Sequence, residues 1–217
     1  RKIRNVLRVL VANLYDFDPA VDVVPHESML SVDRYILSRL ARLDRTVRAD
    51  YDAYDFQSLA HTINEFVTVE LSALYLDVSK DRLYTFRPAA PERRSAQTAL
   101  YHLANGLVRL IAPLLSMTAD EIWRHLPGTR ESSVHLAEFL ATPDTWVDDA
   151  LDEQWEHLAR IRRTVNEALE VARAAKTIGA PLTAHVTVTA SGDDLRRLRA
   201  VEADLPMIFI VSQVTLA

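Results

Sequence analysis

The 217-residue sequence contains no cysteine. This absence excludes disulfide bonds, thiolate nucleophiles and every metal site that needs a cysteine ligand. Glycine is also scarce, because the chain has only four, well below the roughly 7% of average usage. So few glycines disfavour glycine-rich phosphate-binding loops and sheets with many tight turns. We therefore expect a fold built from long helices.

Long apolar runs are missing as well. No stretch approaches the roughly 18 unbroken apolar residues that a membrane span requires, and no apolar signal region follows the N-terminal R-K-I-R-N. These absences predict a cytoplasmic protein that does not contact a membrane. The chain is 49% hydrophobic and 25% charged. That composition is ordinary for a globular protein, and the length suits one large domain or a medium and a small one.

The formal net charge of −5 argues against a protein that coats nucleic acid indiscriminately, because such domains are usually strongly basic. The charges are, however, segregated along the chain. Four basic residues precede the first acidic one, Asp16, whereas the segment 131–156 holds many carboxylates and neither lysine nor arginine. An acidic protein with local basic strips fits an anionic partner that docks in one defined orientation. This pattern favours RNA as the partner.

Apolar residues recur at three- and four-residue spacing through most of the first 128 residues, which predicts five helices. Ser31 is the predicted N-cap of the second helix, and Thr118 to Glu121 has the form of a capping box that opens the fifth. In chain order, the predicted helices run from the N-terminus to Leu14, from Ser31 to about Tyr54, from after Asp55 to about Leu83, from Pro91 to about Leu110, and from Thr118 to Pro127.

The helical pattern is lost after Thr129, and we predict a linker over 129–148 that wraps the bundle. A long helix follows, with Gly179 as the residue just past its end. The period then changes to an alternation typical of strands. We predict a strand at 185–189, a short helix at 193–203 and a second strand at 207–216.

The predicted fold class is therefore mainly α, in two parts. Residues 1–148 form a helical bundle, and residues 149–217 form a long helix followed by a small, incomplete α/β unit. Because the chain opens inside a helix without a methionine and ends on a strand, we expect it to be a fragment of a longer polypeptide.

No catalytic or metal-binding motif is present. The sequence lacks H-E-x-x-H, G-x-S-x-G, a P-loop and G-x-G-x-x-G. Glu121 with His125, and Glu153 with His157, share a helix face, but a di-metal bundle would need partner motifs that are missing, and both pairs are predicted to lie on wet surfaces. We predict no catalytic residue, no metal site and no cofactor in this chain.

Basic side chains gather at helix ends. Lys80 and Arg82 lie at the end of the third predicted helix, where cations complement the helix dipole. Arg93 and Arg94 lie at the start of the fourth predicted helix, where their positive charge opposes the dipole of that helix. Their presence there requires either a buried acidic partner, such as Asp77 or Asp81, or a phosphate.

Seven segments have the form of family motifs: R-K-I-R-N at 1–5, N-L-Y-D-F-D-P at 13–19, D-R-Y at 33–35, K-D-R-L-Y at 80–84, R-R-S-A-Q-T at 93–98, A-P-L-L-S-M-T-A-D-E-I-W at 112–123 and I-G-A-P-L at 178–182. Through these segments the sequence resembles the anticodon-binding region of bacterial isoleucyl-tRNA synthetases. The resemblance runs from end to end and in order. Related synthetases have segments similar to that at 112–123, whereas the segments at 80–84 and 93–98 indicate the isoleucyl enzyme.

The resemblance implies a helical bundle of the class Ia anticodon-binding type. It also implies a full-length, monomeric enzyme that charges isoleucine tRNA using ATP with magnesium, with its catalytic and editing domains outside this chain. A zinc module is possible beyond the C-terminal end. The implied partners are isoleucine tRNA, through its anticodon arm, and the catalytic domain of the same polypeptide.

Under this hypothesis, arginines and lysines position phosphates and side-chain amides read splayed bases. The R-R-S-A-Q-T segment has an alternative interpretation as an internal network that locks the helix turn. A further set of candidates lies on the helix after 149: Arg160, Arg162, Arg163, Arg173 and Lys176. Two other functions stay open, a helical protein-interaction module and the corresponding domain of a valyl or leucyl synthetase. The predicted RNA contacts are Arg1, Lys2, Arg4, Asn5, Arg8, Lys80, Arg82, Arg93, Arg94 and Gln97.

Overall fold

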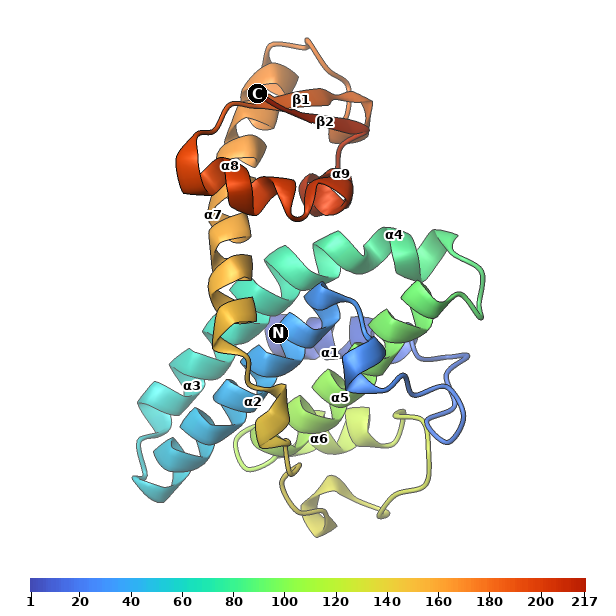
Figure 1. The fold of residues 1–217 in the computed structure, drawn as a ribbon. Coiled ribbons are helices and arrows are strands. Elements are labelled where there is room, and N and C mark those ends of the chain that lie inside the picture. Colours follow the sequence, from blue (N-terminus) through green and yellow to red (C-terminus); the bar gives the residue numbers. More distant parts are fainter. The chain divides into compact units, whose positions relative to one another are not determined.

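The computed structural model describes residues 1–217 and separates them into two units, Arg1–Asp149 and Ala150–Ala217. Both units are mainly helical (Figure 1), which confirms the predicted fold class. No helix is both long enough and apolar enough to cross a membrane.

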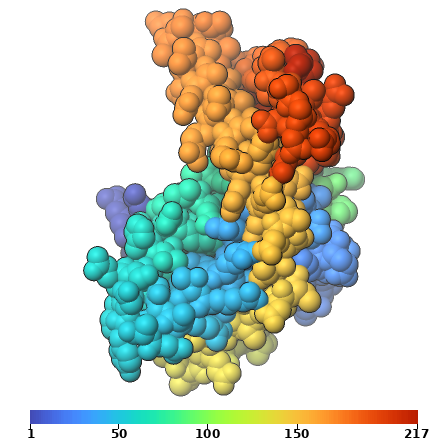
Figure 2. Space-filling view, turned by 60° about the vertical axis from the view of Figure 1, so that its left-hand side comes forward, coloured from blue at the N-terminus to red at the C-terminus, as the bar shows by residue number.

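The first unit is a helical bundle around two long helices, α2 and α5, which pack against each other. Gly106 of α5 allows this close approach, because a Cβ there would lie 3.2 Å from a methyl group of Leu40 in α2. α2 also packs on α3, and the two lie side by side on one face of the unit (Figure 2). The helices are α1 (Lys2–Ala12), α2 (Ser31–Asp52), α3 (Phe56–Glu65), the π-helix η2 (Phe66–Leu76), α4 (Asp77–Thr85), α5 (Pro91–Ile111) and α6 (Ser116–Trp123).

The predicted third helix is one continuous helical segment from Phe56 to Thr85, but its middle, η2, winds as a π-helix. The apolar pattern contains the reason. Phe66 and Leu71 are both buried although they lie five positions apart. An α-helix would turn them to different faces, whereas π winding with its i→i+5 hydrogen bonds keeps them together.

The segment after α6 lies against the bundle without forming a long helix. It contains two short 3₁₀ turns, η3 (Val134–Leu136) and η4 (Asp144–Trp146), whose Val134 and Trp146 are buried. Arg48 of α2 donates a hydrogen bond to the carbonyl oxygen of Leu140, 2.8 Å away. The segment is therefore held by side-chain contacts to α2.

The second unit consists of a long helix and a small α/β element. Its two strands pair in parallel, with His185 opposite Gln213 and Val188 opposite Leu216. Its elements are α7 (Asp149–Ala174), η5 (Pro181–Thr183), β1 (His185–Val188), α8 (Gly192–Arg199), η6 (Glu202–Asp204), α9 (Leu205–Phe209) and β2 (Gln213–Leu216).

Two predicted helix starts are wrong. Ser31 is the first residue of α2 and not its cap; Leu30 precedes it, with its backbone N–H donated to Ser95 Oγ at 3.0 Å. α6 begins at Ser116, ahead of the predicted capping box. The box does not form because Thr118 lies inside α6 and not at its N-cap, and the carboxylate of Glu121 bonds Arg4 instead.

Two predicted boundaries in the second unit are also wrong. α7 ends at Ala174, and the left-handed residue that follows is Lys176, with φ 58°, in place of Gly179. The predicted strand at 207–216 begins as a helix, α9, since its buried residues Leu205, Ile208 and Phe209 have helical spacing. The strand is limited to Gln213–Leu216.

Candidate nucleic-acid interface

The first helix presents a polar, mostly basic face. Leu7 and Leu10 are buried and attach α1 to the bundle, where it packs on α5, α6 and η2. The opposite side of the helix is exposed. We call this side the α1 strip, and it consists of Arg1, Lys2, Arg4, Asn5 and Arg8, all exposed.

One member of the α1 strip is already paired. Arg4 donates two hydrogen bonds to the carboxylate of Glu121 on α6, at 2.6 and 2.7 Å. Hydrogen bonding from Arg4, aided by the charge of Arg8, lowers the pKa of Glu121. Arg1, Lys2 and Arg8 form no ion pair. The strip therefore has uncompensated positive charge available to an anionic ligand.

The turn between α4 and α5 gathers the other predicted residues, as expected, but most of them point inward. Arg82 is 3% exposed and donates to both carboxylate oxygens of the fully buried Asp33, at 2.8 and 2.9 Å. The same carboxylate accepts hydrogen bonds from Tyr75 Oη at 2.7 Å and Ser95 Oγ at 2.5 Å. Arg82 is thus an internal residue, and the prediction that it contacts RNA is wrong. Lys80 stays half-exposed and bonds Asp77 at 2.8 Å.

Arg93 and Gln97 are internal as well. Arg93 is 3% exposed and donates to both carboxylate oxygens of Asp16, at 2.7 and 3.0 Å. Gln97 is fully buried and donates to Asp16 Oδ1 at 2.8 Å and to the Asn13 carbonyl oxygen at 2.9 Å. These hydrogen bonds lower the pKa of Asp16, and the bond from Arg93 has the largest effect. The prediction that these two side chains contact RNA is corrected by their burial.

Arg94 is mostly enclosed by the same network. Its guanidinium donates to the Asp16 carbonyl oxygen and to Gln97 Oε1, both at 2.8 Å, and it approaches Asp22 at 3.4 Å. The acidic partners of the double arginine are therefore Asp16 and Asp22, and not the suggested Asp77 or Asp81.

The rest of the R-R-S-A-Q-T segment has the same structural role. Ser95 Oγ and Thr98 Oγ1 accept the backbone N–H groups of Leu30 and Val24, each at 3.0 Å. Together with Arg93 and Gln97, they hold the loop 13–30 on the N-terminal half of α5. The alternative interpretation of this segment, an internal network that locks the turn, matches the geometry.

The pattern analysis did not select the exposed aromatic side chains beside this network. Tyr15, Tyr84 and Phe86 are 80%, 68% and 43% exposed. The Arg93 guanidinium lies 5.9 Å from the Tyr15 ring centre, and its Nε donates to the Leu83 carbonyl oxygen next to Tyr84. Exposed aromatics beside cations are the stacking groups of single-stranded RNA sites. Their signal in the sequence is an aromatic residue directly after the first and third predicted helices, Tyr15 after Leu14 and Tyr84 after Leu83.

The candidate RNA contacts on α7 also divide into buried and exposed side chains. Arg162 is buried, and its Nε donates to the Ile208 carbonyl oxygen at 2.8 Å, so its predicted role as an RNA contact is wrong. Arg160, Arg163 and Lys176 are exposed, and Arg173 approaches Glu170 at 3.4 Å.

The two histidine pairs do not form metal sites. His157 is 9% exposed, so the prediction of a wet surface is wrong there, and its Nε2 faces Asp194 at 3.5 Å. Glu121 is occupied by Arg4. The structure contains no group of three or more His, Cys, Asp or Glu side chains that could hold a metal ion.

Known proteins resemble this chain over its full length. An isoleucine–tRNA ligase of Geobacter sulfurreducens is 49% identical over 216 residues, one of Moorella thermoacetica is 47% identical over 218, and one of Natranaerobius thermophilus is 43% identical over 217. Each alignment covers 100% of this chain, which spans 23% of the length of each relative. The sequence model of the family described as "Anticodon-binding domain of tRNA ligase" matches residues 33–188. The chain belongs to this family of anticodon-binding domains of tRNA ligases.

Proposed function

We propose that this chain binds the anticodon arm of isoleucine tRNA as part of a longer isoleucine–tRNA ligase, which attaches isoleucine to that tRNA with ATP. Membership of the anticodon-binding family supports the anticodon arm as the ligand, and the similarity to isoleucine–tRNA ligases supports isoleucine as the amino acid. The observation that carries the proposal is the α1 strip, in which Arg1, Lys2 and Arg8 form no ion pair while Arg82, Arg93 and Arg94 are engaged internally.

In the proposed mechanism the α1 strip contacts phosphates and a base edge, and the exposed aromatics stack on bases. Arg1, Lys2 and Arg8 place phosphates, because salt-dependent cation–phosphate contacts set affinity and register. The side-chain amide of Asn5 offers both a donor and an acceptor to a base edge. Tyr15 and Tyr84 offer ring faces on which unstacked bases of a loop can stack.

The remaining parts of the reaction are assigned to segments outside this chain. In the proposal, a catalytic body of the same polypeptide binds ATP with magnesium, any zinc module lies beyond the C-terminal end, and the enzyme works as a monomer in the cytoplasm. No residue of this chain is assigned to ATP or to a metal.

The proposal is tested by measuring how strongly the chain prefers isoleucine tRNA over other tRNAs. The chain is titrated by fluorescence anisotropy against isoleucine tRNA, valine and leucine tRNAs, and an unrelated tRNA at the same salt concentration. We expect the tightest binding for isoleucine tRNA, by at least about tenfold, equivalent to about 1.4 kcal/mol.

Each other outcome favours a different function. Preference for valine or leucine tRNA would assign the chain to the corresponding synthetase. Equal and weak binding to every tRNA would contradict the proposal and favour a helical protein-interaction module.

A further inference from the structure

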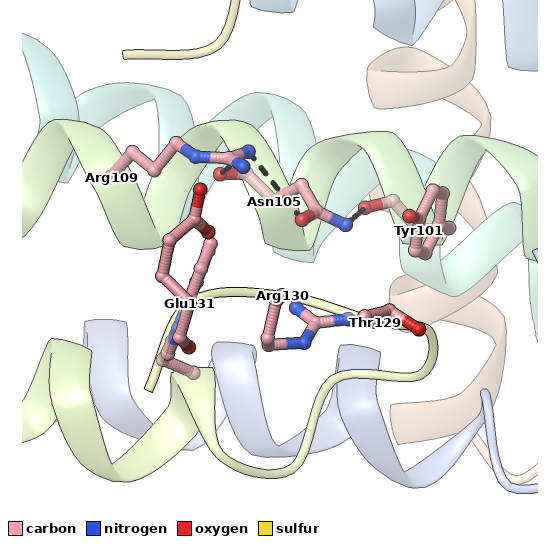
Figure 3. A pocket seen from close by; sticks show the side chains of 7 residues that line it. Tyr101, Asn105, Arg109, Thr129, Arg130 and Glu131 are labelled. Atoms are coloured by element: carbon pink, nitrogen blue, oxygen red, sulfur yellow. Dashed lines mark hydrogen bonds between the residues drawn. The ribbon is translucent and has the colours of Figure 1, made fainter. Parts of the chain in front are cut away.

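A pocket of about 440 Å³ opens between α5 and the turn that follows α6 (Figure 3), and none of the residues assigned above to RNA lines it. Its walls include the side chains of Arg109 on α5 and of Arg130 and Glu131 on the turn. The volume falls within the range of pockets that hold small molecules, roughly 300–1,000 Å³.

Two arginines are fixed on one ring in this pocket. The guanidinium carbons of Arg109 and Arg130 lie 4.8 and 5.0 Å from the ring centre of Trp123. Trp123 is fully buried, and its Nε1 donates to the Glu131 carbonyl oxygen at 2.8 Å. The ring therefore cannot move, and cation–π contact orders both guanidiniums before any ligand arrives.

Each of these guanidiniums keeps a buried donor without an acceptor, although Arg130 Nη2 donates to the carbonyl oxygens of Pro127 and Gly128. Arg109 Nε and Arg130 Nη1 are buried and have no hydrogen-bond partner. Arg109 Nη1 makes only long contacts with Asn105, 3.4 Å to the carbonyl oxygen and 3.5 Å to Oδ1. Asn105 cannot turn further toward it, because its Nδ2 is held by the Tyr101 carbonyl oxygen at 2.9 Å. A buried donor without an acceptor is costly, so the pocket favours a ligand that accepts hydrogen bonds.

The charge in the pocket also favours an anion. Burial lowers the pKa of Arg109 and of Arg130, the charge of Arg109 contributes to lowering the pKa of Arg130, and the charge of Glu131 offsets only part of these shifts. Glu131 is exposed and forms no ion pair with either arginine. Two cations and one carboxylate leave a net charge of +1, which one phosphodiester would neutralise.

We propose that the pocket between Arg109 and Arg130 binds a phosphate group. A guanidinium presents a planar fork of donors to phosphate oxygens, and a phosphate has more acceptor oxygens to offer two such forks than a carboxylate has. The group belongs either to the backbone of a bound RNA or to a free phosphate compound. The proposal does not rest on tRNA binding by the α1 strip, and its first test uses no RNA.

Inorganic phosphate is the probe. The chain is titrated with sodium phosphate while sodium chloride keeps the ionic strength constant, and the thermal midpoint and the ³¹P line width are recorded. We expect broadening of the ³¹P line and a midpoint raised by at least about 2 °C. Arg109→Gln and Arg130→Gln should each lose this response. Arg124→Gln removes an exposed arginine of the same region that pairs with Asp120, and it should keep the response.

A second experiment, with isoleucine tRNA, identifies the source of the phosphate group. An Arg130→Gln affinity at least about fivefold weaker than wild type assigns the pocket to the RNA backbone. An unchanged tRNA affinity, with the phosphate response lost, assigns it to a free phosphate compound. The proposal is overturned if the wild-type chain responds to phosphate no more than to chloride, or if Arg124→Gln loses as much of the response as Arg130→Gln. If Arg109→Gln does not fold, the wild-type titration and Arg130→Gln decide.

Discussion

At the residue scale, the two buried arginines of the α4–α5 turn depend on acids from distant segments. Asp33 holds Arg82 across 49 positions, and Asp16 holds Arg93 across 77. Burial alone would lower the pKa of Arg82, but the charge and hydrogen bonds of Asp33 outweigh burial and raise it. Both guanidiniums therefore stay charged inside the bundle and act as scaffold.

Removing one partner of the buried pair should unfold the chain more easily. We expect Asp33→Asn to lower the free energy of unfolding by about 3–5 kcal/mol, because it leaves the charge of Arg82 buried without compensation. Urea denaturation followed by circular dichroism measures the change. Asp81→Asn is the matched control, since Asp81 is exposed on α4, and it should cost less than about 0.5 kcal/mol. Equal losses in the two variants would contradict the scaffold role of Asp33.

The same residues show why part of the candidate site could not be predicted. Arg93 and Arg94 look like surface cations because they open an amphipathic helix. Whether such a cation is free depends on a loop more than 70 positions away, and no local pattern records that contact. The exposure of the α1 strip follows directly from the helical spacing of Leu7 and Leu10, although the pairing of Arg4 with the distant Glu121 does not.

At the element scale, the segment after α6 is held on α5 by aromatic packing. Trp146 of η4 meets His102 of α5 edge-on, with ring centres 4.9 Å apart, and stacks near His26 at 6.2 Å. Burial, and after it the charge of His26, lowers the pKa of His102 to about 4 from its ordinary 6.5. His102 is therefore neutral in the folded chain at neutral pH.

This histidine should make the bundle sensitive to acid. Between pH 6.5 and 4 the unfolded chain binds a proton at position 102 and the folded chain does not, so stability is complete above pH 6.5 and falls toward pH 4. The lowered pKa of His102 corresponds to a loss of unfolding free energy on the order of 3 kcal/mol. We expect His102→Gln to reduce the drop in unfolding free energy across this range, measured by urea denaturation at several pH values. The same drop in wild type and variant would show that His102 is not responsible.

Element types were more predictable than element ends. The apolar spacing located the helices of the first unit because each buries one continuous stripe. Tertiary contacts decided the details, as where Arg4 takes the carboxylate of Glu121 that a capping box would need. The apolar run at 207–216 is ambiguous between helix and strand, and only its packing makes Leu205–Phe209 a helix.

At the scale of the whole molecule, the first unit neutralises most of its positive charge internally. Four arginines of α2 form ion pairs: Arg39 with Glu70, Arg42 with Asp149, Arg45 with Asp144, and Arg48 with Asp44. The α1 strip is different, because three of its cations form no ion pair. In an acidic protein such a group of exposed, unpaired cations favours docking of an RNA on that surface.

The most direct test of this account is the affinity of the Arg8→Ala variant for isoleucine tRNA across a salt series, beside Arg45→Ala as a control with a paired, exposed arginine. We expect Arg8→Ala to weaken binding severalfold at low salt and to reduce the slope of log affinity against log salt by about 1, because one phosphate contact is lost. Arg45→Ala should leave both unchanged. Identical affinities and slopes for wild type and Arg8→Ala would contradict the assignment of the α1 strip as the RNA-binding surface.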